Sequence, residues 1–75
     1  MNMGKLDAAE EKFRKTITNP QTPQREKVLS HVRLARILDW KGQQSEAIKE
    51  YRIVLSLEDI EGSHDQATQY LKQHQ

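Results

Sequence analysis

Three breaks divide this chain into segments of helical length, and they constrain its fold more than any other feature. The first lies at residues 19–23 and contains Pro20 and Pro23, the two prolines of the chain. The second is Gly62, which follows an acidic run at residues 58–61, and a weaker one is Gly42. Because helices joined by short links pack as antiparallel neighbours, the sequence predicts stacked helical hairpins.

The two segments before Gly42 are expected to form helices over residues 5–18 and 23–41. In the first, apolar residues recur at three- and four-residue steps and share one helix face, namely Leu6, Ala9, Phe13 and Ile17. In the second, Thr22 is expected to cap the N-terminus and Pro23 to occupy the first turn, while Lys41 and Gly42 suit its C-terminus. Its apolar residues fall on several arcs, which indicates a helix packed between neighbours.

The two later segments are expected to form helices over residues 44–57 and 63–73. The third has an apolar face of Ala47, Ile48, Tyr51, Val54 and Leu55, and the fourth a short stripe of Ala67, Tyr70 and Leu71. Ser63 and Gln66 have the spacing of a capping box. No run has the period of a strand, so we expect an all-α fold of four helices in a single domain, residues 1–75.

Length and composition limit what such a domain can do. A chain of 75 residues buries a thin core, and without cysteine it has no disulfide or thiolate metal site. It has no apolar run long enough for a membrane span and no signal region. We therefore expect a cytoplasmic protein that does not bind membranes, or a fragment whose targeting segment lies elsewhere. The net charge of +1 predicts no bulk affinity for nucleic acid.

The first and third segments repeat a pattern. Residues 8–15 align with residues 46–53, and in each an alanine, Ala9 or Ala47, precedes an aromatic residue by four positions. Gly4 and Gly42 each stand five residues before that alanine. The chain is therefore expected to contain a duplicated helical unit.

This pattern resembles the tetratricopeptide repeat family, whose unit is a helix–turn–helix with small and large residues at set positions. The matching residues are Leu34, Ala35 and Leu38 in the first helix, Gly42 at the turn, and Ala47 and Tyr51 in the second helix. His31 stands where tryptophan is usual, and Asp59 where a closing proline is usual. The resemblance implies one full repeat over residues 28–61, after the second helix of another repeat and before a capping helix, in a short right-handed array.

The sequence contains no motif that is typical of a catalytic or metal-binding site. His31, His64 and His74 lack ligand spacing, and we expect the first to be partly buried and the other two to be solvated. The acidic run at residues 58–61 lacks the calcium-loop pattern. There is no glycine-rich phosphate loop and no nucleophile elbow, so we expect no enzyme activity, no cofactor and no metal.

The second segment carries the candidate site. Leu29, Arg33, Arg36 and Trp40 fall on one arc of the helical wheel, and mixtures of aromatic residues and arginine are typical of binding hot spots. Residues 24–41 hold five basic against two acidic residues, and residues 42–61 two against five. The alternative interpretation is a contact of Arg36 with the Trp40 ring and otherwise solvated charges. The family resemblance implies that this helix lines the concave, ligand-binding face.

The leading hypothesis is a protein–protein interaction module, a scaffold or adaptor that binds a peptide or protein partner. The expected ligand carries acid groups beside an apolar anchor, because arginine forks hold carboxylates and tryptophan supplies buried area. The alternative is self-association, as a weak homodimer or as the end piece of a longer repeat protein, because repeat arrays usually need about three repeats. Nucleic-acid binding is a further rival, against which stands the lack of a wider basic patch.

Overall fold

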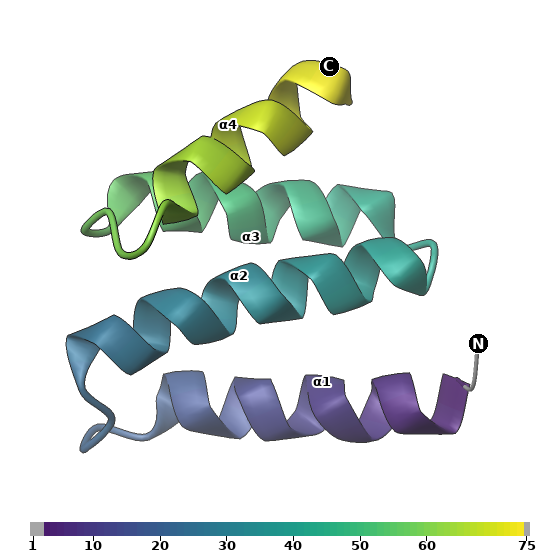
Figure 1. The fold of residues 1–75 in the computed structure, drawn as a ribbon. Helices are drawn as coiled ribbons and strands as arrows, with labels where there is room; N and C mark the ends of the chain where they lie inside the picture. Colours follow the sequence, from purple (N-terminus) through teal and green to yellow (C-terminus); the bar gives the residue numbers. More distant parts are fainter. Residues whose placement is uncertain (1–2, 75) are drawn as a thin grey trace.

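The computed structural model describes residues 3–74, and within them all regular structure is helical. The four helices are α1 (Met3–Thr18), α2 (Gln24–Trp40), α3 (Gln44–Ser56) and α4 (Ser63–Gln73). Successive helices run in opposite directions, with α1 and α3 on the two sides of α2 and α4 against α3 (Figure 1). The predicted all-α fold of four helices is confirmed.

The turn before α2 differs from its prediction. The helix begins at Gln24, one residue later than expected, and Pro23 is its N-cap residue, whose carbonyl accepts from the Lys27 N–H at 3.0 Å. No side chain caps this end, so the predicted Thr22 cap is wrong. Asn19 shapes the turn instead, because its Oδ1 accepts from the Gln21 N–H at 2.9 Å.

Gly42 ends α2 as a Schellman motif. It has a positive φ of 81°, a conformation that glycine adopts without steric cost. The Gln43 N–H donates to the Leu38 carbonyl at 2.8 Å, and the Gly42 N–H donates to the Asp39 carbonyl at 3.0 Å. This pair of bonds ends α2 at Trp40 and turns the chain directly into α3, which fixes the α2–α3 hairpin.

The connection from α3 to α4 is held by Asp59, and the predicted capping box is wrong. Ser63 is the first helical residue rather than the cap, and its Oγ accepts from the Ile60 N–H at 2.9 Å. Asp59 Oδ1 accepts from the His64 N–H at 3.1 Å, so the aspartate serves an N–H group at the start of α4. Gly62 precedes the helix with a φ of 78°.

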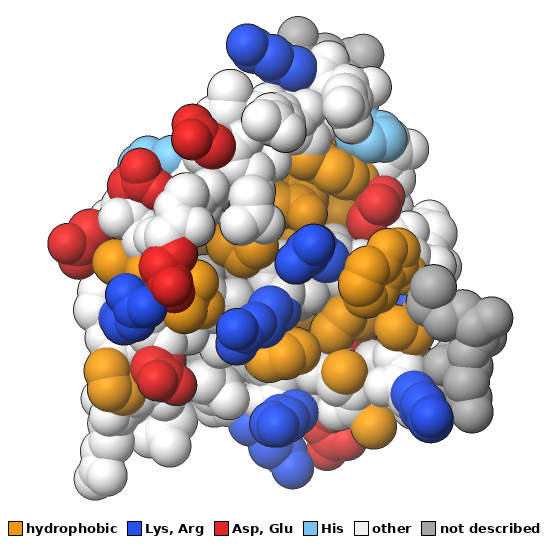
Figure 2. All heavy atoms as spheres, viewed as in Figure 1, with side chains coloured by type: hydrophobic (Ala, Val, Ile, Leu, Met, Phe, Trp, Pro, Cys, Tyr) orange, Lys and Arg blue, Asp and Glu red, His pale blue; other side chains and the backbone are white. Residues whose placement is uncertain are grey.

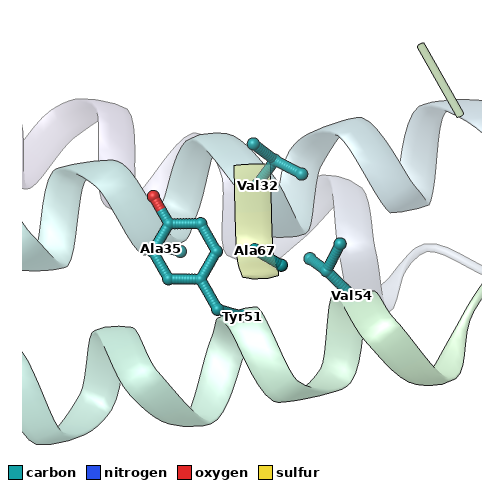
Figure 3. Close-up of a cluster of buried hydrophobic side chains, with 5 residues drawn as sticks. All are labelled: Val32, Ala35, Tyr51, Val54 and Ala67. Carbon is teal, nitrogen blue, oxygen red and sulfur yellow. The ribbon is translucent and has the colours of Figure 1, made fainter. Parts of the chain in front are cut away.

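The core lies on two sides of α2, as the several apolar arcs of that helix predicted. Figure 3 shows one cluster, in which side chains of α2, α3 and α4 meet: Val32, Ala35, Tyr51, Val54 and Ala67. The other cluster contains Leu34, Leu38 and Ala47, and Phe13 and Ile17 of α1 pack against it. Burial on both sides holds α2 in the middle of the domain and leaves one side of it for solvent.

The flanking helices present polar outer surfaces. Of the described residues, the large hydrophobic side chains that are exposed are Trp40, Ile53 and Leu55, all on α2 and α3. Tyr70 and Leu71 of α4 pack against the cluster that α2, α3 and α4 share. Within residues 3–74, none of the helices combines the length and the apolar character that a membrane crossing needs.

Candidate interaction surface

Three of the four predicted site residues surround one hollow. Arg33, Arg36 and Trp40 line a depression of about 140 Å³ together with Phe13 and Ile37. Both arginines are exposed, and 54% of Trp40 is exposed. These five residues are called the binding surface below.

Leu29 lies apart from this surface. It is half-buried and does not line the hollow, although it shares the helical arc of the other three residues. Phe13 was expected in the core stripe of α1, and it is half-buried with part of its ring at the hollow. A helical wheel describes one helix at a time, so it cannot predict that a residue of α1 lies beside a site on α2.

The two arginines of the binding surface have no ionic partner among residues 3–74. No ion pair or side-chain hydrogen bond holds Arg33 or Arg36, and no cation–π interaction of Arg36 with the Trp40 ring is present there. Two of the other three cations of residues 24–41 are paired, since Arg25 binds Glu61 at 2.6 Å and Lys41 binds the carboxylates of α1. Lys27 has no ion pair within residues 3–74 and does not line the hollow. The basic excess counted along residues 24–41 is therefore partly neutralised, and two of its three unpaired cations line the binding surface.

Asp39, the nearest acid along α2, is occupied by another group. The hydroxyl of Tyr70 donates to Asp39 Oδ1 at 2.7 Å. Burial, and then this hydrogen bond, raise the pKa of the Tyr70 hydroxyl. The ring of Tyr70 also lies 4.4 Å from that of Tyr51, centroid to centroid. The carboxylate of Asp39 therefore anchors α4, and Arg36 is left without an ion pair.

Lys41 joins α1 to the end of α2. Its Nζ contacts carboxylate oxygens of Asp7 at 2.5 Å and Glu10 at 2.8 Å. These hydrogen bonds, that to Asp7 first, raise the pKa of Lys41. Lys41 and then Arg14 lower the pKa of Glu10 by donating to its carboxylate. The network holds α1 against α2 and so places Phe13 beside the hollow.

Two other hollows offer less to a charged ligand. The larger, of about 420 Å³, lies over α1 beside Lys41, and its cations Arg14, Lys15 and Lys41 are paired with carboxylates. The other, of about 150 Å³, contains His31 and Glu50, which bond to each other at 2.7 Å. The charged groups named in these two hollows already bond to other side chains, whereas the arginines of the binding surface do not.

All three histidines take part in the fold. His31 is half-buried as expected, but the expectation of solvated His64 and His74 is wrong, because both are half-buried. His64 Nε2 lies 2.6 Å from the Leu57 carbonyl, and the His74 ring stacks on Tyr70 with 4.1 Å between centroids. Within residues 3–74, no cluster of three histidine or carboxylate side chains could hold a metal ion.

In comparisons with known proteins, no family model, no curated protein and no solved structure matches the chain.

Proposed function

We propose that this chain is a tetratricopeptide-type interaction module that binds an acidic peptide, or an acidic segment of a protein, on the binding surface. The repeat assignment is supported by the burial of the motif residues. Leu34, Ala35, Leu38, Ala47 and Tyr51 are all buried, at the contacts between α2 and its neighbours. The role is that of a scaffold or adaptor, without catalysis, cofactor or nucleic acid.

One observation carries the proposal: two unpaired arginines, one helical turn apart, stand beside a half-exposed tryptophan. Each guanidinium can hold a carboxylate through two parallel hydrogen bonds, a geometry that lysine does not reproduce. Trp40 and Phe13 offer flat apolar area next to these charges, where a leucine or an aromatic side chain of the ligand can pack. The surface therefore fits a ligand in which acid groups flank an apolar anchor.

Binding can be measured through Trp40, which is the single tryptophan of the chain. Short blocked peptides with a leucine or phenylalanine between glutamates should change its fluorescence on titration. The same peptides with glutamines in place of glutamates are the matched ligands, and they should bind far more weakly because the arginines lose their carboxylate partners.

The variants Arg33→Ala and Arg36→Ala should each weaken binding of the glutamate peptides by about 1–3 kcal/mol, the range for desolvated hydrogen bonds to charged groups. Arg52→Ala is the control, because Arg52 is an exposed arginine of α3 that also has no ion pair within residues 3–74. Equal binding of glutamate and glutamine peptides would refute the proposal. So would an equal loss of affinity in the Arg52 variant.

A further inference from the structure

Basic and acidic side chains are unevenly distributed over one broad face of the molecule, although Arg25 pairs with Glu61 at 2.6 Å. Figure 2 shows lysine and arginine side chains among hydrophobic ones over the middle of this face, where α2 runs. Acidic side chains gather toward its left side, where the α3–α4 connection lies. The acids of this connection and of the first turn of α4 are called the acidic corner below: Glu58, Asp59, Glu61 and Asp65.

The acidic corner has the composition expected of a ligand for the binding surface. Glu58 and Asp65 are exposed and have no ion pair or side-chain hydrogen bond among the described residues. Leu57 and Ile60 are half-buried, so part of each apolar side chain is accessible between the acids. The chain thus carries both an unpaired basic surface with an aromatic residue and an acidic segment with apolar side chains.

We propose that a second copy of this chain is a ligand of the binding surface, and that the acidic corner of each copy docks beside Arg33, Arg36 and Trp40 of the other. This inference rests on the proposed function, because it uses the same surface. Both regions lie on one face, so a twofold axis between them lets each copy give and receive the same contact. The assembly is then a closed dimer and not an open chain.

The face is large enough for such a dimer. The molecule measures 31 × 30 × 17 Å along its principal axes, so it is a slab with one broad face on each side. A specific interface needs about 800 Å² from each partner, which is within reach of a face of this breadth. Ile53 and Leu55, the exposed apolar residues of α3, are the competing basis for pairing. An apolar pairing through α3 would not respond to charges at the binding surface or the acidic corner.

A charge exchange tests the pairing by sedimentation velocity over a micromolar to millimolar concentration series. Arg33→Glu with Arg36→Glu makes both docked contacts repulsive, and so does Glu58→Lys with Asp65→Lys. Each double variant should raise the dissociation constant of the dimer by about tenfold or more, because like charges then face each other. An equimolar mixture of the two double variants should form a heterodimer, since opposite charges meet again at both contacts. Circular dichroism checks that both variants keep the helical spectrum of the parent chain.

Three results would overturn the inference: a parent chain that stays monomeric at millimolar concentration, a dimer that resists both charge reversals, or a mixture that fails to pair. The peptide titration separates this outcome from a failure of the proposed function. Glutamate peptides that bind a chain which never dimerises would leave the peptide-binding function standing and remove the self-association alone. Growth to species larger than a dimer would contradict the closed, twofold arrangement.

Discussion

At the scale of single residues, the fold depends on two alanines. Ala35 and Ala47 are both 0% exposed. They belong to the two different core clusters that lie on the two sides of α2. A methyl side chain at these points lets the helix backbones approach closely, while Leu34 and Tyr51 fill the adjacent space. The size of the residue, and not its chemistry, is what these positions require.

Ala47→Leu should therefore destabilise the domain by roughly 1–3 kcal/mol, because a larger side chain overpacks the contact with Leu34 and Leu38. Glu46→Leu is the matched variant, since Glu46 is exposed on the preceding position, and it should change stability by about 0.5 kcal/mol or less. Urea unfolding of both proteins measures the difference. Equal midpoints would show that the register of the α2–α3 hairpin is wrong.

The ion pairs of Lys41 give the stability of the domain a defined dependence on pH. Since the pKa of Glu10 is lowered in the folded state, its contribution is present above the ordinary value of 4.5 and is lost as pH falls through the lowered pKa. Lys41 acts in the opposite sense, because its pKa is raised above 10.5 and its contribution is lost only as pH rises through the raised value. We therefore expect the free energy of unfolding to fall below pH 4.5.

Glu10→Gln should reduce this acid-side loss, because the variant has no carboxylate to protonate at that position. Glu11→Gln is the control, since Glu11 forms an exposed pair with Lys15 in which both side chains are at least 70% exposed. The measurement is the difference in unfolding free energy between neutral pH and acid below 4.5, for the parent and both variants. An identical loss in the Glu10 variant and the parent would show that Glu10 does not cause the loss of stability in acid.

At the scale of elements, the conformational preference of a single residue predicted a helix end correctly. Capping hydrogen bonds, which need a donor and an acceptor from different residues, were assigned to the wrong side chains. Gly42 marked the end of α2 because a positive φ suits glycine whatever surrounds it. The starts of α2 and α4 were assigned to Thr22 and Ser63 from local spacing. Asn19 and Asp59 act at those turns instead. Several polar side chains near a turn can accept hydrogen bonds from its N–H groups, and the path of the backbone determines which of them does.

One hydroxyl adds to the apolar packing that docks α4 against α2, which gives a further prediction. Tyr70→Phe removes the bond to Asp39 and should cost about 0.5–1.5 kcal/mol, the net worth of a typical hydrogen bond. Tyr51→Phe is the control, because the Tyr51 hydroxyl has no hydrogen bond within residues 3–74. Hydrogen exchange of the α4 amides should rise in the Tyr70 variant and stay unchanged in the control. Equal protection of α4 in both variants would mean that ring packing alone holds the helix.

At the scale of the whole molecule, periodicity was enough to predict four antiparallel helices, with α2 packed between its neighbours. It was also enough to place Arg33, Arg36 and Trp40 on one exposed side of that helix. It could not predict that α1 would bring Phe13 to the same hollow, or that Leu29 would lie outside it, because these depend on how helices pack. Nor could it predict which cations are neutralised, since Lys41 meets carboxylates more than thirty positions away.

We propose that the exposed side of α2 binds a ligand and is not a part of the core. In Trp40→Ala, stability and affinity for the glutamate peptides can be measured in the same protein, by urea unfolding and by calorimetry. Because Trp40 is 54% exposed, we predict a loss of stability of about 1 kcal/mol or less and a loss of most of the peptide affinity. A variant that unfolds outright would show that Trp40 belongs to the core, and a folded variant with full affinity would show that the peptide binds elsewhere.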